Sequence, residues 1–221
     1  MASNDLPVGE PVPSVEVDLP PRAPLRGAFV TLEPVDPERH AQGLFAAGHG
    51  SPAADALWTY LPYGPFDDPA AMRRWLETLP GSNDPMFFAV MRGEAPVGMT
   101  SFLNIDTEMR RVELRHIWFG PAAQRTEANT EAAFLMLGWA FDAGYRRAEW
   151  KCDARNARSR AAAERLGFVF EGVFRRHMIV KGQNRDTAWF SIVDDEWPSI
   201  HERLRSWLDE RLAANGPPPP P

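Results

Sequence analysis

The sequence predicts a mixed α/β fold in which helices flank one central sheet. Short apolar runs bounded by turn residues indicate strands, as at residues 86–91. Apolar residues spaced three to four positions apart indicate amphipathic helices, as at residues 68–79. The two kinds of segment do not strictly alternate along the chain, so we expect a mixed sheet rather than a fully parallel one.

The first half of the chain contains clear boundary signals for its elements. Pro37 lies near the start of a predicted helix, where the missing N–H of proline is harmless. Gly93 marks a turn that joins two paired strands. The strands expected here are residues 29–33, 86–91, 95–105 and 110–119, and the helices are residues 37–47 and 68–79.

Glycines mark the element ends in the second half. A long apolar helix over residues 129–143 ends at Gly144, a left-handed cap position. A second helix, residues 156–166, closes on Gly167, and a terminal hairpin turns around Gly182. The strands expected here are residues 147–153, 168–180 and 187–193, and the last helix is residues 200–212.

We expect one domain, residues 25–212, between two proline-rich tails. Residues 1–24 are rich in proline, valine and acids, and residues 213–221 end in five prolines. Such segments favour an extended or disordered state over a packed core. A proline-rich ligand for a partner domain is the alternative for both tails.

Composition excludes several classes of protein. A net charge of −6 argues against general affinity for nucleic acid or anionic membranes. The single cysteine, Cys152, rules out an internal disulfide and a cysteine-based zinc cluster, and we expect no metal. No apolar run approaches the roughly 20 residues that span a bilayer, and the N-terminus lacks the pattern of a secretory signal. We therefore expect a soluble cytoplasmic protein.

The segment over residues 112–137 is the strongest functional signal. It contains an apolar strand, a short polar loop and a helix that opens on Asn129, Thr130 and Glu131. This order directs free backbone N–H groups and the positive end of a helix dipole at one spot beyond the strand. An anion, above all a phosphate, fits that spot.

Three segments together resemble the GNAT superfamily of N-acetyltransferases, in particular its RimJ/RimL-like branch related to ribosomal-protein N-terminal acetyltransferases. Residues 113–119 (ELRHIWF) resemble the fourth strand of that branch, and residues 124–132 (QRTEANTEA) stand at its pyrophosphate loop. Residues 156–159 (NARS), leading to residues 164–168 (ERLGF), resemble the segment beside the cofactor arm. The resemblance covers roughly residues 25–195.

The resemblance implies a mostly antiparallel sheet of six to seven strands, splayed between the fourth and fifth. It implies an acyl-CoA-dependent N-acyltransferase that transfers acetyl from acetyl-CoA to a primary amine by direct attack in a ternary complex. The acceptor would be a small-molecule amine or a protein N-terminus, and the assembly a homodimer. One alternative is a GNAT-fold protein that binds coenzyme A without turnover, and another is a hydrolase on the same fold.

The resemblance also assigns the coenzyme site, with two departures in its loop. Where the family pattern has glycine or alanine, this chain has Glu127 and Asn129, and a carboxylate close to a pyrophosphate is repulsive. Arg125 can offset that charge. The expected coenzyme-binding residues are Trp118, Phe119, Gln124, Arg125, Thr126, Glu127, Ala128, Asn129, Thr130, Asn156 and Ser159.

Three residues are candidates for the chemistry of acyl transfer, in which a base must remove a proton from the amine. Glu113 matches the glutamate proposed as the base in the branch, and its alternative role is an ion pair with Arg115 on the same strand face. His116 has a suitable ordinary pKa, but alternation places it opposite Glu113 unless a bulge intervenes. Ser159 would contact the coenzyme sulfur, since Ala163 replaces the family's tyrosine.

An aromatic loop broken by proline and glycine, residues 57–66, occupies the region that covers the acceptor pocket in the family. Trp58, Tyr60 and Tyr63 would line this pocket, or else pin the loop to the core. Residues 175–177 (RRH) and Lys181 near the terminal hairpin suit an acidic substrate or the coenzyme 3′-phosphate, and a solvated strand face explains them equally well.

Overall fold

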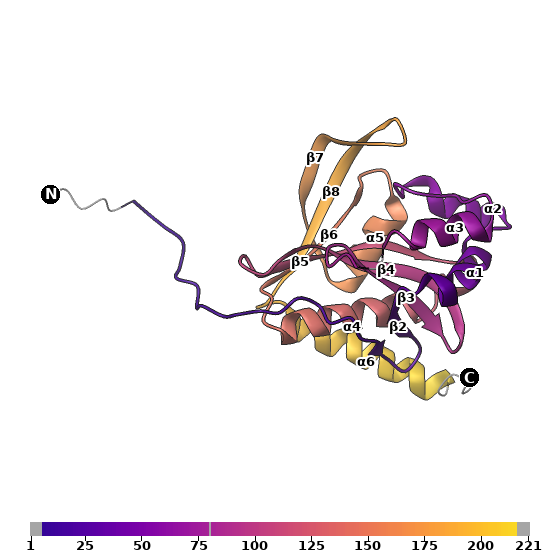
Figure 1. Ribbon diagram of the computed structural model, residues 1–221. Helices are drawn as coiled ribbons and strands as arrows, with labels where there is room; N and C mark the ends of the chain where they lie inside the picture. The colour runs from indigo at the N-terminus through magenta and orange to yellow at the C-terminus, as the bar shows by residue number, and fades with distance from the viewer. Residues whose placement is uncertain (1–5, 80, 216–221) are drawn as a thin grey trace.

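The computed structural model describes residues 6–79 and 81–215, and one open sheet organises them (Figure 1). The strand order is β1-β2-β3-β4-β5-β6-β8-β7. Every neighbouring pair is antiparallel except β5 and β6, which run parallel. The strands are β1 (Leu25–Arg26), β2 (Thr31–Pro34), β3 (Met86–Arg92), β4 (Ala95–Asp106), β5 (Arg111–Phe119), β6 (Arg147–Asp153), β7 (Val169–Val180) and β8 (Gln183–Val193).

The mixed, mostly antiparallel sheet is confirmed, and it has eight strands instead of six to seven. The additional strand is β1, which turns back on β2 and pairs Leu25 with Leu32. A short strand of this kind has no periodic sequence signal because two residues cannot display alternation.

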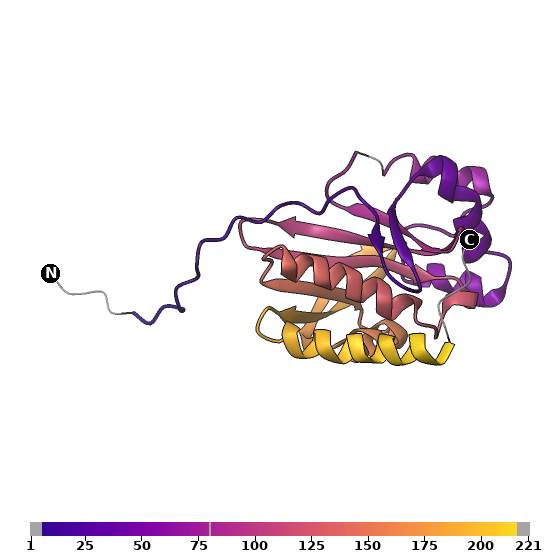
Figure 2. The same ribbon diagram turned by 90° about the horizontal axis from the view of Figure 1, so that it is seen from below.

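Helices cover both faces of the sheet. The larger buried cluster packs α4, α5 and α6 on one face, and a smaller cluster packs α1 and α3 on the other. Figure 2 shows α4 and α6 side by side across the first face. The helices are α1 (Pro37–Gly48), α2 (Pro52–Asp55), η1 (Ala56–Thr59), α3 (Pro69–Leu76), η2 (Pro121–Ala123), α4 (Ala128–Asp142), α5 (Ala157–Leu166) and α6 (Trp197–Asn215).

Side-chain caps explain where three of the helices begin. Asp36, Asp68 and Asn156 each accept a hydrogen bond from a first-turn N–H, at α1, α3 and α5 respectively. The predicted end of α3 was too late, because the N–H groups of Thr78 and Leu79 bond three residues back in tight turns. The last helix is longer than predicted at both ends, so residue 212 lies inside α6.

The chain before β1 has no regular secondary structure within the described residues, and its first part extends away from the body (Figure 1). Nearer the sheet it makes contacts: Tyr145 Oη donates to Asp18 O over 2.9 Å, and Arg22 donates to Ser82 O over 2.6 Å. Residues 1–5 and 216–221 of the expected tails lie outside the described ranges. None of the described helices has an apolar stretch long enough to span a lipid bilayer.

The feature that positions the site is a split between β5 and β6. Their parallel pairing ends at Leu114 and Trp150. Beyond that point β5 continues beside β4 to Phe119, and β6 continues beside β8 to Asp153. The expected splay is therefore confirmed. Among the described residues, the part of β5 after Leu114 pairs with no strand along its edge toward β6.

Candidate functional site

Hydrogen bonds from its own side chains fix the conformation of the loop between β5 and α4. Gln124 Nε2 donates to Phe119 O over 3.0 Å, and Thr126 Oγ1 donates to Ala123 O over 2.7 Å. Arg125 adopts a left-handed backbone with φ +60°. These bonds carry the chain from the splayed end of β5 into the first turn of α4, whose N–H groups have no partner within the helix. The geometry of the loop is therefore compatible with an anion bound at the start of α4.

The charge of Glu127 in this loop is directed toward β3. Arg92 Nη2 lies 3.7 Å from Glu127 Oε2 and also donates to Thr126 Oγ1 over 3.1 Å. Arg92 therefore takes the offsetting position that sequence reasoning assigned to Arg125, whose side chain is exposed. No sequence signal pointed to Arg92, because only the fold brings the end of β3 next to this loop.

The other side of the split is lined by the start of α5. Asn156 Oδ1 accepts from Ser159 N over 3.1 Å and so caps the helix. Ser159 Oγ accepts from Trp150 Nε1 over 3.0 Å. Because the indole supplies the donor, the serine hydroxyl can donate its own hydrogen, and Cys152 is one neighbour within its reach. Burial raises the pKa of Cys152, which keeps this thiol protonated and inert.

Glu113 lies on β5 at the origin of the split and has no exposed surface. Its Oε2 accepts from Asn104 Nδ2 and pairs with Lys151 Nζ, each over 2.8 Å. Its Oε1 pairs with Arg115 Nη1 over 3.1 Å. The sequence identified the Arg115 pair as one alternative, but it did not identify Asn104 or Lys151. Three donors hold this carboxylate, two on Oε2 and one on Oε1, so Oε1 keeps capacity to accept a further hydrogen bond.

A β-bulge directs His116 to the same face of the sheet as Glu113. The register shifts between Met99 and Ser101, and His116 has φ +54°. The imidazole packs 4.8 Å from the ring of Phe87 and 5.5 Å from that of Tyr63. Burial, reinforced by nearby cations, lowers the pKa of His116 to about 3, so the ring is neutral near pH 7. This is the bulge that the alternation argument required.

The aromatic loop (residues 57–66) closes over this face. Trp58 is only 1% exposed, and its indole donates to Gly48 O over 2.8 Å. Lys181 on the β7–β8 turn donates to Trp58 O over 2.7 Å and to Gly64 O over 2.6 Å. Tyr60 Oη donates to Arg155 O over 3.4 Å, beside the cap of α5. The loop thus connects the α1–α3 layer to both the hairpin and α5.

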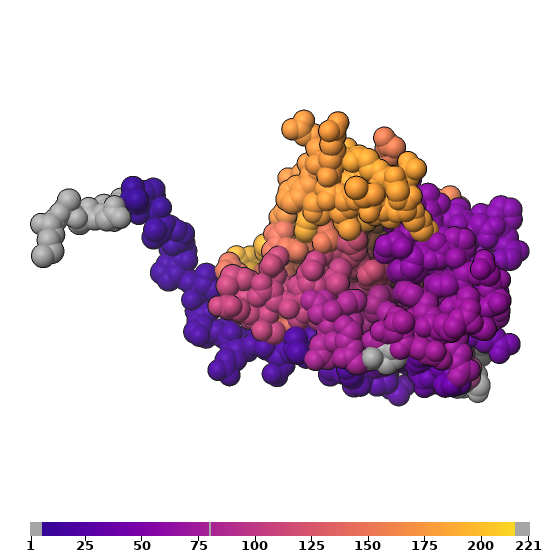
Figure 3. All heavy atoms as spheres, turned by 45° about the horizontal axis from the view of Figure 1, so that its top comes forward, coloured from indigo at the N-terminus to yellow at the C-terminus, as the bar shows by residue number. Residues whose placement is uncertain are grey.

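Tyr63 and Trp118 complete the aromatic wall. The Tyr63 ring stacks on the Trp75 ring, with 4.1 Å between ring centres. Burial raises the pKa of the Tyr63 hydroxyl. The Trp118 ring lies 5.2 Å from that of Trp58, and both Trp118 and Phe119 are buried. Figure 3 shows the surface hollowed between this region and the β7–β8 hairpin. A concavity of about 710 Å³ on the hairpin is lined by residues 174–177.

The predicted residues therefore form two groups beside one split. Gln124, Thr126, Ser159 and Asn156 surround the end where α4 and α5 begin. Glu113 and His116 occupy the opposite face, together with Tyr63. Across the described residues, no group of three or more histidine, cysteine and acidic side chains could hold a metal ion. This arrangement suits an extended ligand that runs from the start of α4 through the split toward Glu113 and His116.

Comparisons with known proteins agree with this geometry. Residues 30–169 match the family model described as "Acetyltransferase (GNAT) domain". A crystal structure of a GCN5-related N-acetyltransferase from Brucella melitensis is 42% identical and superposes with a TM-score of 0.84, covering 87% of this chain and 88% of that one. A structure of Mycobacterium smegmatis RimJ in complex with CoA-disulfide, 24% identical, has the same fold with a TM-score of 0.69 over 83% of this chain and 92% of that one.

A curated relative from Bacillus subtilis (strain 168) carries the name "Putative ribosomal N-acetyltransferase YdaF". It is 31% identical over 101 residues, a match that spans 45% of this chain and 55% of the relative. The matched region thus covers about half of that protein's length.

Proposed function

This chain belongs to the GNAT acetyltransferase family, and on that premise we propose that it transfers an acyl group, by default acetyl from acetyl-CoA, to a primary amine. The split between β5 and β6 carries the proposal. A thioester arm lying in this split reaches the unpaired edge of β5 and can accept backbone hydrogen bonds there. Amine and thioester would meet in a ternary complex at the bulge around His116.

The residues around the split fit coenzyme A. The pyrophosphate would lie against the first turn of α4, cradled by residues 124–130. Arg92 restrains the charge of Glu127 at this position. Asn156 stands where the pantetheine arm would pass, at the start of α5. The CoA-disulfide in the RimJ structure supports this ligand class by likeness of fold.

Two side chains are assigned to proton movement. Glu113 would take the proton of the attacking amine, since its carboxylate lies beside the bulge where the acyl carbon would be. Ser159 would donate its hydroxyl hydrogen to the departing thiolate, because Trp150 already supplies a hydrogen bond to its oxygen. When bound, the coenzyme supplies the activated thioester.

The acceptor is either a protein N-terminus or a small-molecule amine. The name of the Bacillus subtilis relative supports the first of these and a cytoplasmic site of action. Coenzyme binding without turnover is the competing function, and the charge of Glu127 in the loop favours it. We assign homodimer formation only as an expectation of the family.

The test separates binding from turnover. Thermal shifts are measured with acetyl-CoA and with acetyl-pantetheine, which lacks the phosphates, and thiol release is then followed with a panel of amines and peptides. We expect stabilisation by acetyl-CoA alone and thiol release with at least one amine. Stabilisation without thiol release would support the binding protein. No stabilisation by acetyl-CoA would refute both functions.

A further inference from the structure

Arg185 on β8 is a buried cation without a counterion. Its side chain points to the same face of the sheet as Thr187 and Trp189, because Ala188 and Phe190 face the opposite core. The residue is 4% exposed, and among the described residues its side chain forms no hydrogen bond and no ion pair. Burying an unpaired guanidinium is unfavourable, and its Nε is among the buried atoms without a partner. A bound anion would remove that cost.

The surroundings of Arg185 carry more positive than negative charge. Arg115 and Lys151 lie in the same region, and they share one buried carboxylate, Glu113. Burial and then Arg115 lower the pKa of Arg185, whereas Asp153 and Glu113 act in the opposite direction. Asp153 is only partly buried and already accepts from a backbone N–H through Oδ1. One buried cation, Arg185, and two partly buried cations, Arg115 and Lys151, therefore lie near one fully buried carboxylate.

Other buried polar atoms on this side of the sheet also lack partners among the described residues. Lys151 Nζ lies over the ring of Trp189 at 4.7 Å, which places that indole beside the cation cluster. His177, which lines the concavity on the hairpin, lies 6.0 Å from Trp189 between ring centres. The buried side-chain atoms without a partner in the described residues are Tyr63 Oη, His116 Nδ1, Trp118 Nε1, Arg185 Nε and Trp189 Nε1. They belong to the aromatic loop, β5 and β8, and a polar ligand on this side of the sheet would supply the missing partners.

We propose that the amine acceptor carries a carboxylate close to its amine and that Arg185 binds this carboxylate, while Arg115 and Lys151 add positive charge. The inference rests on the proposed acyl transfer and names the chemical class of its acceptor. A guanidinium fits because its fork of N–H donors binds a carboxylate in a bidentate manner. The amine end would then lie toward Glu113 and His116.

Two sources can provide such a carboxylate, a free amino acid or an acidic side chain near a peptide N-terminus. Two matched pairs of acceptors separate them. The first pair is glutamate and its α-amide. The second pair is two C-terminally amidated tripeptides that differ only in aspartate or asparagine at the second position. Thiol release is measured for all four, and binding of each to the coenzyme-loaded protein is measured by calorimetry.

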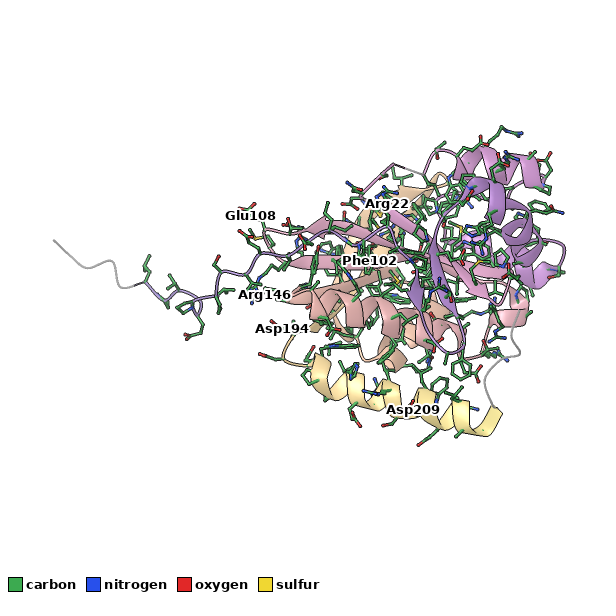
Figure 4. The ribbon with its side chains drawn as sticks, turned by 60° about the horizontal axis from the view of Figure 1, so that its bottom comes forward. Arg22, Phe102, Glu108, Arg146, Asp194 and Asp209 are labelled. Atoms are coloured by element: carbon green, nitrogen blue, oxygen red, sulfur yellow. The ribbon has the colours of Figure 1, made fainter. Side chains whose placement is uncertain are left out.

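The variants are Arg185→Gln, the conservative Arg185→Lys and the control Arg146→Gln. Arg146, labelled in Figure 4, is an exposed arginine directly before β6, five residues along the chain from Lys151. For the preferred acid, we expect Arg185→Gln to lower kcat/KM by about 10- to 100-fold. For the matching amide, kcat/KM of the variant should stay within about twofold of the wild-type value. Arg185→Lys should recover part of the preference, and Arg146→Gln should retain all of it.

Each outcome either supports the carboxylate proposal or contradicts it. If acid and amide partners bind and react equally in the wild-type protein, the proposal is wrong. It is also wrong if Arg185→Gln keeps the preference, or if that variant weakens coenzyme binding instead. If no acceptor releases thiol but the acid binds through Arg185, the carboxylate site stands and the proposed transfer fails. Calorimetry thus distinguishes failure of the inference from failure of the proposed function.

Discussion

Glu113 and Glu131 are two buried glutamates in neighbouring elements, and they are satisfied in different ways. Glu131 on α4, which is 4% exposed, accepts from the backbone N–H groups of Ala28, Phe29 and Val30 at 2.7 to 2.8 Å. Glu113 on β5 is held only by side chains. Backbone donors fix one geometry, whereas side-chain donors can move aside. The first arrangement therefore serves stability, and the second can serve chemistry.

The close packing around Glu131 supports its structural role. A Cβ on Gly27 would lie 2.3 Å from Glu131 Cδ, so the turn between β1 and β2 needs glycine there. In the sequence, Glu131 directly follows the proposed coenzyme loop, residues 124–130. Its side chain nevertheless points to the turn between β1 and β2. Proximity in the motif is therefore a poor guide to role.

The largest expected effect is on turnover in Glu113→Gln. If Glu113 accepts the amine proton, kcat falls by about 100- to 10,000-fold while coenzyme affinity is unchanged. Steady-state thiol release and calorimetry with acetyl-CoA measure the two quantities. Asn104→Ala is the matched control, because it removes a donor to the carboxylate but keeps the base. Unchanged turnover in Glu113→Gln would eliminate Glu113 as the base.

Glu131→Ala should reverse this pattern. It leaves three backbone donors without a partner and costs about 3 kcal/mol of unfolding free energy, which corresponds to a fall in Tm of roughly 6–12 °C. Turnover of the folded variant at low temperature should stay within a few-fold of wild type. Glu164→Ala, at an exposed position of α5, provides the control in the same melting experiment. A loss of turnover without a change in Tm would contradict the structural role.

The lowered pKa of His116 predicts that the free energy of unfolding depends on pH. Its folded pKa is about 3, below the ordinary 6.5, so between these values the unfolded chain binds a proton that the folded chain does not. Stability therefore falls as pH drops below 6.5, with a slope from this group of at most about 1.4 kcal/mol per pH unit.

The variant His116→Asn tests this slope, because asparagine also tolerates the left-handed backbone. Urea unfolding at pH 6.5 and pH 5 gives the change in unfolding free energy for each protein. The variant should lose less stability than wild type over this interval, whatever its stability at pH 6.5. Equal losses would mean that His116 is not buried in its neutral form.

The fold was readable from the sequence because its signals are local. Pro37 marked the start of α1 and Gly167 the end of α5, and the strand predicted over residues 147–153 coincides with β6. The cation cluster was not readable in this way. Lys151 and Arg185 lie on different strands, and they approach Glu113 only through the strand pairing and the shared face. The hairpin run over residues 175–177 was noted for an acidic substrate, but the buried Arg185 beside it was missed.

Arg92→Gln should produce the smallest effect, at the coenzyme loop. Removing this cation takes away one interaction that restrains Glu127, so its charge repels the pyrophosphate more strongly. Because the pair is partly exposed, coenzyme affinity should fall by only about two- to fivefold. In the Glu127→Gln background the same change should have less effect, since no carboxylate remains to repel the phosphates. Calorimetry on the four proteins of this cycle measures the coupling, and independent effects would show that Arg92 acts on the coenzyme without Glu127.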